Sequence, residues 1–270
     1  MANTHTIFAI IAVLVELPFT NKLIWLAEKI VPVLPEENQQ LEDRSLIYMT
    51  QMTKVPAPVA LRQTQREITR MGHIAADNLK RALDCFFNYS TSKAASVRSH
   101  ESVNILNHLI ADAMVDLRSL DLSPENMRRV SMMTIAVTDI ERLSDHAENI
   151  VEYIEQMNAK KAEMSEAARK ELLDMSQDAL DAVYLALDIF EKDDYSKLDQ
   201  IEILEQHVDD HEKDLINNHI ERIMNSMCNP LGGVIFSDLV TDLERCSDHA
   251  INLAYALKER PSELDAPKLV

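Results

Sequence analysis

The chain has 270 residues, a formal net charge of −18 and a pI near 4.8, with only 3 Gly, 9 Pro and 5% aromatic residues. A surface this acidic repels a phosphate backbone and excludes nucleic-acid binding, and the scarcity of turn and aromatic residues excludes a chain built mainly of strands. The abundance of Ala, Leu, Met, Glu, Lys and Arg instead predicts an all-α protein made of long helices.

The first residues differ in composition from the rest of the chain. Residues 7–19 are nearly all apolar but include Glu16, and a second apolar stretch follows over 23–34. The first run is shorter than the roughly 20 residues that a free-standing transmembrane helix needs, and no signal-peptide pattern flanks it. Two interpretations of residues 1–36 therefore stay open: a kinked membrane-associated helix followed by an interfacial helix, or an amphipathic docking helix of a soluble protein.

Residues 37–58 contain prolines and polar residues, and we interpret them as a linker. From residue 59 onward, helical patterns alternate with polar breaks at 88–93, 121–124, 159–165, 193–196 and 229–230, which predicts six helices. Ser123-Pro124 and Asn229-Pro230 each place a capping side chain before a proline at the first helical position. We expect them to begin the third helix of each half, residues 59–160 and 161–260, with residues 261–270 as a tail.

The two halves repeat each other. Glu67–Phe86 matches Glu171–Phe190 at a shift of 104, and Thr138–Asn149 matches Thr241–Asn252 at a shift of 103, where nine of twelve residues are identical. Most of these nine are polar or charged, whereas packing alone preserves apolar positions. The repeat therefore indicates a shared site and predicts two tandem three-helix bundles related by a pseudo-twofold axis.

Each repeated segment carries a row of oxygen ligands, because residues four apart lie on the same helix face. The two rows are Glu141, Asp145 and Asn149, and Glu244, Asp248 and Asn252. Carboxylates one turn apart repel each other unless a cation or a basic side chain lies between them. Their oxygens suit Mg²⁺, Mn²⁺, Ca²⁺ or iron, and less often Zn²⁺.

An adjacent stripe of each copy carries an acid, an arginine and a histidine: Asp139, Arg142 and His146, and Asp242, Arg245 and His249. The acid and the arginine have the i,i+3 spacing of a helical ion pair. The histidines either complete a metal shell or are core histidines satisfied by a backbone carbonyl. The alternative for the whole motif is an interhelical salt-bridge network made with basic residues of a neighbouring helix.

Catalytic motifs are absent from the sequence, which has no Glu-x-x-His pair, no Gly-rich phosphate loop and no G-x-S-x-G elbow. Clustered carboxylates also serve two-metal hydrolases, but no nucleophile or general acid accompanies them here. We therefore expect a protein that is not an enzyme. The cysteines, Cys85, Cys228 and Cys246, have no metal-site or redox spacing, which favours buried thiols in a reducing compartment.

The run Asp139-x-Glu141-Arg142-x-x-Asp145-His146-Ala147-x-Asn149-Ile150, repeated from Asp242, resembles the repeated motif of PhoU proteins, and the resemblance extends over roughly residues 60–257. Ser144 and Ser247 stand where the family usually has Gly. The resemblance implies two three-helix bundles with iron, zinc, magnesium or manganese ions. Its implied ligands are Glu141, Asp145, Glu244 and Asp248, supported by Asp139, Asp242, Asn149 and Asn252. His146 and His249 stay additional candidate ligands on the spacing of the motif alone.

The same resemblance implies a non-catalytic role in regulating phosphate uptake and signalling. Its implied partners are a membrane transporter domain or a sensor protein, with inorganic phosphate bound through the metal and a homodimer as a compatible assembly. The alternative is a metal-independent helical scaffold that docks on a transporter or a sensor kinase.

Residues 2–8, followed by Leu17-Pro18-Phe19, resemble the last membrane segment of bacterial Na⁺/phosphate cotransporters that carry a C-terminal PhoU domain, with Ala9 where those proteins commonly have Asn. Pro58 and Glu67 resemble the entry of their cytoplasmic domain. The chain would then correspond to the C-terminal part of such a cotransporter. This implies a place on the cytoplasmic face of the bacterial inner membrane, with the N-terminal segment membrane-associated.

Overall fold

The computed structural model describes residues 43–49, 54–88, 100–225 and 227–258. Within these ranges the regular structure is entirely helical, without strands, and the predicted all-α class with six helices is confirmed. The helices are α4 (Ala57–Phe87), α6 (His100–Arg118), α7 (Pro124–Lys160), α8 (Glu166–Lys192), α9 (Leu198–Met224) and α10 (Pro230–Tyr255), with a 3₁₀ turn, η3 (Tyr195–Lys197), before α9.

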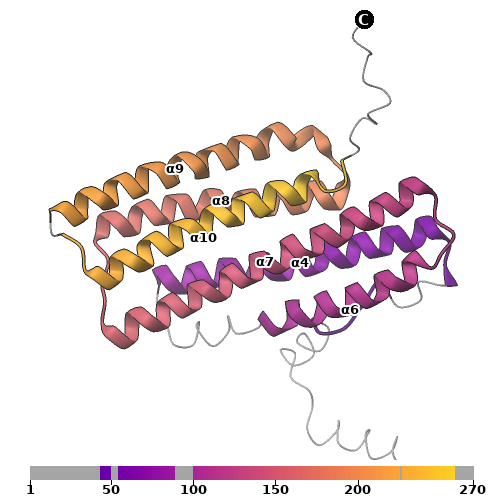
Figure 1. Cartoon of the computed structure of the whole chain (residues 1–270), viewed down its shortest axis with the longest axis horizontal. Helices are drawn as coiled ribbons and strands as arrows, with labels where there is room; N and C mark the ends of the chain where they lie inside the picture. Colours follow the sequence, from indigo (N-terminus) through magenta and orange to yellow (C-terminus); the bar gives the residue numbers. More distant parts are fainter. Residues whose placement is uncertain (1–42, 50–53, 89–99, 226, 259–270) are drawn as a thin grey trace, which may run out of the picture. The chain divides into compact units, whose positions relative to one another are not determined.

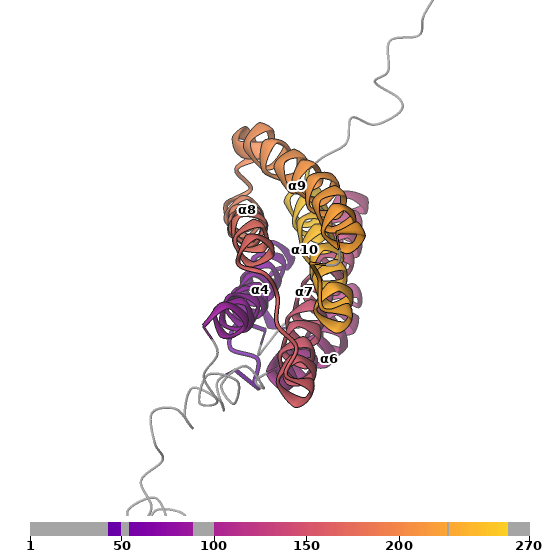
Figure 2. The same cartoon turned by 90° about the vertical axis from the view of Figure 1, so that its left-hand side faces the viewer.

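The helices form two three-helix groups that share one core (Figures 1 and 2). Helices α4, α6 and α7 pack together, as do α8, α9 and α10, and the groups meet where α4 and α7 contact α8 and α10. Both groups lie in one compact unit that begins at Asp43. The predicted apolar segment 1–36 lies outside the described residues, and none of the described helices has the length and apolarity to cross a membrane.

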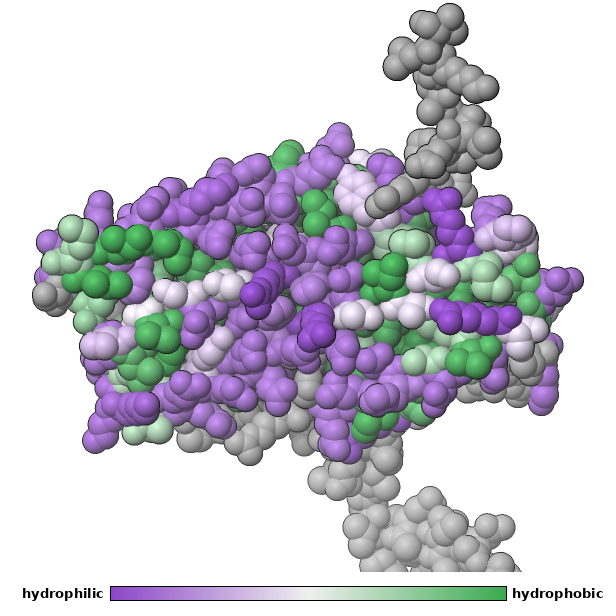
Figure 3. All heavy atoms as spheres, in the orientation of Figure 1, coloured by the Kyte–Doolittle hydropathy of each residue, from purple (hydrophilic) through white to green (hydrophobic). Residues whose placement is uncertain are grey.

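The face of the molecule that carries α7, α9 and α10 is mostly hydrophilic in its middle, and apolar side chains gather toward its two ends (Figure 3). The middle of this face is where α7 and α10 pack against each other. The polar residues of the repeated segments therefore lie where the two three-helix groups meet.

The predicted helix caps are confirmed. Ser123 Oγ accepts a hydrogen bond from the backbone N–H of Asn126 at 3.2 Å, and Asn229 Oδ1 accepts from those of Leu231 and Gly232 at 3.0 and 3.2 Å. These bonds satisfy donors that would otherwise be unpaired at the start of α7 and α10. Because α7 and α10 carry the repeated polar segments, the caps also fix where those segments begin.

Gly72 lets α4 approach the second repeat closely. A Cβ at this position would lie 2.3 Å from Leu187 Cδ2 of α8 and 3.3 Å from Ile140 Cδ1 of α7. The absence of a side chain therefore brings three helices together at the centre of the shared core, where Leu187 and Ile140 are fully buried.

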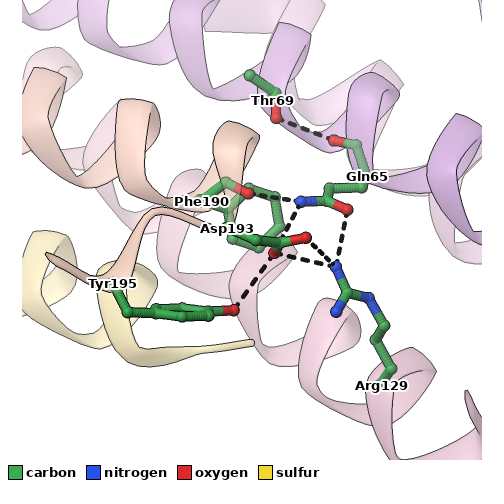
Figure 4. Close-up of polar contacts among 6 residues, drawn as sticks. All are labelled: Gln65, Thr69, Arg129, Phe190, Asp193 and Tyr195. Atoms are coloured by element: carbon green, nitrogen blue, oxygen red, sulfur yellow. Dashed lines mark hydrogen bonds and ion pairs between the residues drawn. The ribbon is translucent and has the colours of Figure 1, made fainter. Parts of the chain in front are cut away.

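A polar cluster joins the first repeat to the end of α8 (Figure 4). Gln65 of α4 donates to the carbonyl of Phe190 at 2.6 Å, and Arg129 of α7 donates to Gln65 Oε1 at 2.9 Å and to Asp193 at 2.8 Å. Tyr195 donates to Asp193 at 3.3 Å. Asp193 ends α8 in the left-handed region, with φ 53°, a conformation that Asp tolerates better than most residues.

Part of the expected linker packs against α4. The carboxylate of the buried Glu67 accepts from the backbone N–H groups of Ile47 and Tyr48 at 2.9 and 2.6 Å, and it also pairs with Arg70. Met49 is buried against the core. Residues 43–49 are thus held by one buried carboxylate, and the rest of the linker as far as residue 42, with residues 50–53, lies outside the described residues.

Candidate metal centre and inter-repeat site

The two copies of the repeated segment face each other across α7 and α10, which run in opposite directions (Figure 1). His146 Nδ1 lies 2.8 Å from Asp242 Oδ1, and His249 Nδ1 lies 3.0 Å from Asp139 Oδ1. The copies therefore exchange equivalent bonds, as the predicted pseudo-twofold relation requires. We call these two Asp–His contacts the inter-repeat pairs.

The inter-repeat pairs have unequal surroundings. Asp242 also accepts from Tyr153 Oη at 2.7 Å and from Asn149 Nδ2 at 3.3 Å, whereas Asp139 Oδ2 is buried without a hydrogen-bond partner. Burial and the bond to Asp242 raise the pKa of Tyr153 well above its usual value. The position equivalent to Tyr153 is Ala256, directly after the end of α10, which has no hydroxyl to donate. The more fully satisfied carboxylate is thus the one in the second repeat.

Each histidine of the motif is bonded to a carboxylate of the other repeat. Because a carboxylate only accepts, Nδ1 of each ring carries a proton. His146 is buried, and its Nε2 has no hydrogen-bond partner. The two rings lie near each other, with centroids 5.7 Å apart. The histidines are therefore bonded to side-chain carboxylates and not to the backbone carbonyl that one interpretation of the sequence expected, and their role as metal ligands stays a prediction.

The carboxylates predicted to hold metal lie on another stripe and take no part in the inter-repeat pairs. Arg142 pairs with Asp145 at 3.2 Å instead of with Asp139, the partner that its spacing also allowed. The reason is that Asp139 points to α10 and is occupied by His249. Asp145 therefore already has a cationic neighbour on its own helix, although both side chains stay substantially exposed.

In the second repeat, Glu244 faces carboxylates of α9. Burial raises the pKa of Glu244, and so do the neighbouring charges of Asp248, Glu212 and Asp209, in that order. The pKa of Glu205 is raised by burial and then by Asp209, Asp248 and Glu202. We call the set that these interactions bring together the α9–α10 acidic cluster: Glu205, Asp209, Glu212, Glu244 and Asp248.

The α9 members of this cluster were not predicted from the sequence. Glu205 and Asp209 have the same i,i+4 spacing as Glu244 and Asp248, so a search for paired carboxylates would have found them. They stood out less because α6 has no matching pair at the corresponding positions, Glu101 and Ile105. The spacing of two carboxylates along one helix also does not show which neighbouring helix these side chains face.

The acidic cluster fits a hard cation by its chemistry, because it gathers carboxylate oxygens at a partly buried surface. Burial raises the pKa of Glu205 and of Glu244, and the charges of neighbouring carboxylates raise both further, so a nearby cation would favour the ionised cluster. Among the described residues, no group of three or more His, Cys, Asp or Glu side chains is arranged to hold a metal ion directly. Binding would therefore require these side chains to turn toward a common centre.

A cavity of about 680 Å³ opens between the repeats beside the inter-repeat pairs. Both copies of the motif contribute arginine, aspartate, histidine and asparagine side chains to it. Its lining is Arg142, Asp145, His146, Glu148, Asn149, Arg245, Asp248, His249 and Asn252. Six predicted site residues are thereby brought to one cavity, whereas Glu141, Glu244, Asp139 and Asp242 do not line it.

Comparison with solved structures shows the same fold in two proteins of low sequence identity. PhoU from Pseudomonas aeruginosa superimposes with a TM-score of 0.68 at 19% identity, over 73% of this chain and 94% of that one. The phosphate transport system regulatory protein PhoU from Streptococcus pneumoniae gives 0.67 at 19% identity, over 75% of this chain and 95% of that one. No curated protein matches the sequence significantly.

The repeats seen in the sequence coincide with a known domain model. The PhoU domain matches residues 68–154 and 172–257, which cover α4 to α7 and α8 to α10. Because these two matches include more than half of the chain, the chain belongs to the PhoU domain family.

Proposed function

We propose that the chain is a non-catalytic regulatory domain of phosphate homeostasis that binds metal ions through its duplicated carboxylate pairs. Membership of the PhoU domain family supports the regulatory role, and one protein of the same fold is described as a phosphate transport system regulator. The resemblance of the first residues to Na⁺/phosphate cotransporters supports a link to sodium-dependent phosphate transport.

The α9–α10 acidic cluster carries the metal proposal. Two facing helices each present an i,i+4 carboxylate pair, Glu205 with Asp209 and Glu244 with Asp248. Burial and, after it, the charges of neighbouring carboxylates raise the pKa of Glu205 and of Glu244. A di- or trivalent cation removes that repulsion and uses the ligand type that hard cations prefer. In the first repeat, Glu141 and Asp145 are the proposed ligands. A bound metal would supply positive charge and open positions for phosphate oxygens.

Elemental analysis of protein reconstituted with iron, zinc, magnesium or manganese tests the metal site. The double variant Glu244→Gln/Asp248→Asn should lose the metal of the second repeat, and Glu141→Gln/Asp145→Asn that of the first. The matched control is Asp210→Asn/Asp214→Asn, which removes the same charge from exposed positions of α9. If the stoichiometry is the same in all three variants as in the parent, the assigned ligands are wrong.

Calorimetric titration with inorganic phosphate tests the proposed phosphate contact. Heat of binding should be present in metal-loaded protein and absent after chelation. Equal affinity in the two states would show that phosphate does not bind through the metal.

A second candidate function is a metal-independent helical scaffold that docks on a transporter or a sensor kinase. It is favoured by the inter-repeat pairs and by the pair between Arg142 and Asp145, in which the protein itself satisfies charges of the repeated motif. This candidate predicts that a chelator leaves both the melting temperature and partner binding unchanged. Loss of partner binding on chelation would exclude it.

The membrane link has a separate test. Removal of Met1–Pro35 should release the chain from membrane vesicles if residues 7–34 anchor it. Equal partitioning of the full chain and the shortened chain would exclude the anchor while leaving the metal proposal intact.

A further inference from the structure

Cys228 differs from the other cysteines by its exposure and by its neighbour. Cys85 and Cys246 are fully buried, whereas Cys228 is partly exposed in the turn between α9 and α10, which corrects the expectation of buried thiols. The Cys228 Sγ atom lies 3.8 Å from Nδ1 of His219, a buried residue of α9. A thiol beside an imidazole is the arrangement in which the thiol proton has an acceptor.

The two ring nitrogens of His219 have different neighbours. The Nε2 edge lies against α10, where a Cβ on Gly233 would be 3.2 Å from Nε2, and Nδ1 faces Cys228. In the tautomer with its proton on Nε2, Nδ1 presents a lone pair to the Cys228 thiol. Burial, followed by the charge of Arg222, lowers the pKa of His219 overall and keeps this ring neutral.

Near His219, the side chain of Arg222 has two N–H groups that lack a hydrogen-bond acceptor. Its Nη1 bonds both oxygens of Glu171 at 2.8 and 3.1 Å, but Nε and Nη2 are buried without a hydrogen-bond partner. The side chain of Arg222 is only 10% exposed and lies over the Phe236 ring at 5.0 Å. A buried guanidinium edge without an acceptor is costly, at about 1–3 kcal/mol or more, so this edge is suited to an oxygen ligand.

Cys228, His219 and Arg222 border one small cavity of about 30 Å³ at the start of α10. This volume accommodates roughly two or three water-sized groups, since a water needs about 10–15 Å³ on the same measure. The cavity is thus large enough for a single oxygen atom attached to sulfur, but not for an organic ligand.

We propose that Cys228 is a peroxide-sensitive thiol whose sulfenic acid is held by Arg222. The Cys228 proton passes to His219 Nδ1 as sulfur attacks hydrogen peroxide, and the O–O bond breaks as the S–O bond forms. Sulfur is oxidised by two electrons, one peroxide oxygen stays on it, and the other leaves as water with the proton from His219. The new oxygen occupies the cavity and accepts from Nε and Nη2 of Arg222.

Trapping with dimedone, a cyclic 1,3-dione specific for sulfenic acid, tests this site. The full chain is treated with hydrogen peroxide at neutral pH, and the adduct is located by peptide mass spectrometry. The adduct should form at Cys228 and not at Cys85 or Cys246. It should form roughly tenfold faster than at Cys228 of the urea-unfolded chain, because a free thiol is only a few per cent ionised at pH 7. The dione separates this product from oxidation of the exposed Met224 and Met227.

Two variants distinguish the role of His219 as the base for the thiol proton from the role of Arg222 as the hydrogen-bond donor to the sulfenic acid. His219→Gln should slow adduct formation toward the unfolded rate, and Arg222→Lys should keep the charge beside Glu171 but shorten the lifetime of the sulfenic acid. Asn218→Ala is the matched control, because Asn218 bonds the same Glu171 at 3.0 Å without lining the cavity. If the folded and unfolded chains react at equal rates, the cavity holds water only and the proposal is wrong, a comparison that needs no variant to fold.

Discussion

The carboxylate of Asp242 in α10 accepts a hydrogen bond from His146 in α7 at 2.8 Å, although the two residues are 96 positions apart in the sequence. The equivalent bond between Asp139 and His249 measures 3.0 Å. The motif residues that look most like a metal site in the sequence are therefore divided by their helices. Asp139, Asp242 and the two histidines join the repeats, whereas the carboxylates predicted to bind metal take no part in these pairs.

Replacing Asp242 by Ala should destabilise the protein more than replacing Asp139 by Ala. Asp242 has three hydrogen-bond partners in α7, namely His146, Asn149 and Tyr153, and their buried groups would lose their acceptor. We expect a loss of about 2–4 kcal/mol for Asp242→Ala and about 1–2 kcal/mol for Asp139→Ala. Urea unfolding followed by circular dichroism measures the free energy of unfolding of both variants. Equal losses would mean that the extra partners of Asp242 contribute nothing.

Glu205→Gln should change stability in opposite directions with and without metal. In chelator, the substitution removes a charge that neighbouring carboxylates oppose, so the melting temperature should rise by about 1–2 °C. With saturating metal, the same variant lacks a ligand and should gain less stability from the metal than the parent. Gln206→Glu adds a charge at an exposed neighbouring position and serves as a control for charge alone. A variant that gains as much from metal as the parent would exclude Glu205 from the site.

The helices and their caps were predictable because their signals are local. Ser123-Pro124 and Asn229-Pro230 act within one turn, and the apolar spacing that forms each helix is read directly from the sequence. Which face of each helix packs against which neighbouring helix was not predictable. Asp139 has Arg142 within reach on its own helix, yet it bonds His249 because α10 packs against that face of α7. The partly exposed Cys228 was missed for the same reason, since a cysteine in a turn gives no local sign of its neighbours.

Gly72→Ala should destabilise the interface between the repeats by about 1–3 kcal/mol, because the added methyl overlaps the Leu187 side chain. A double-mutant cycle with Leu187→Ala identifies the cause. Leu187→Ala alone should cost about 2–5 kcal/mol, and appreciably less in the Gly72→Ala background, because the methyl then fills part of the cavity. Additive losses would show that the Gly72 position acts through helix propensity and not through contact with Leu187.

Arg129→Ala should weaken the polar cluster that joins α7 to the end of α8. Gln65 and Asp193 would both lose the charged guanidinium donor, and we expect the free energy of unfolding to fall by about 1–2 kcal/mol. The adjacent Arg128 is exposed, and Arg128→Ala should stay within about 0.5 kcal/mol of the parent. Hydrogen exchange of the last turn of α8 should quicken in the first variant only. Unchanged exchange there would mean that Arg129 does not hold this helix end.

The ionised carboxylate of Asp188 should stabilise the folded protein at neutral pH, and this contribution should be lost in acid. Hydrogen bonds from Lys192 and then Lys197 lower the pKa of this carboxyl below its usual value. A carboxyl with a lowered folded pKa contributes stability above its unfolded pKa of about 4, and the contribution is lost as the pH falls through the folded pKa. Asp188→Asn should therefore lower the melting temperature by about 1–2 °C at pH 7 and have little effect near pH 3. Asp181→Asn on the same helix is the control, since Asp181 accepts from the neutral amide of Gln177. A deficit for Asp188→Asn that is the same at both pH values would show that the carboxylate charge is not what Lys192 and Lys197 stabilise.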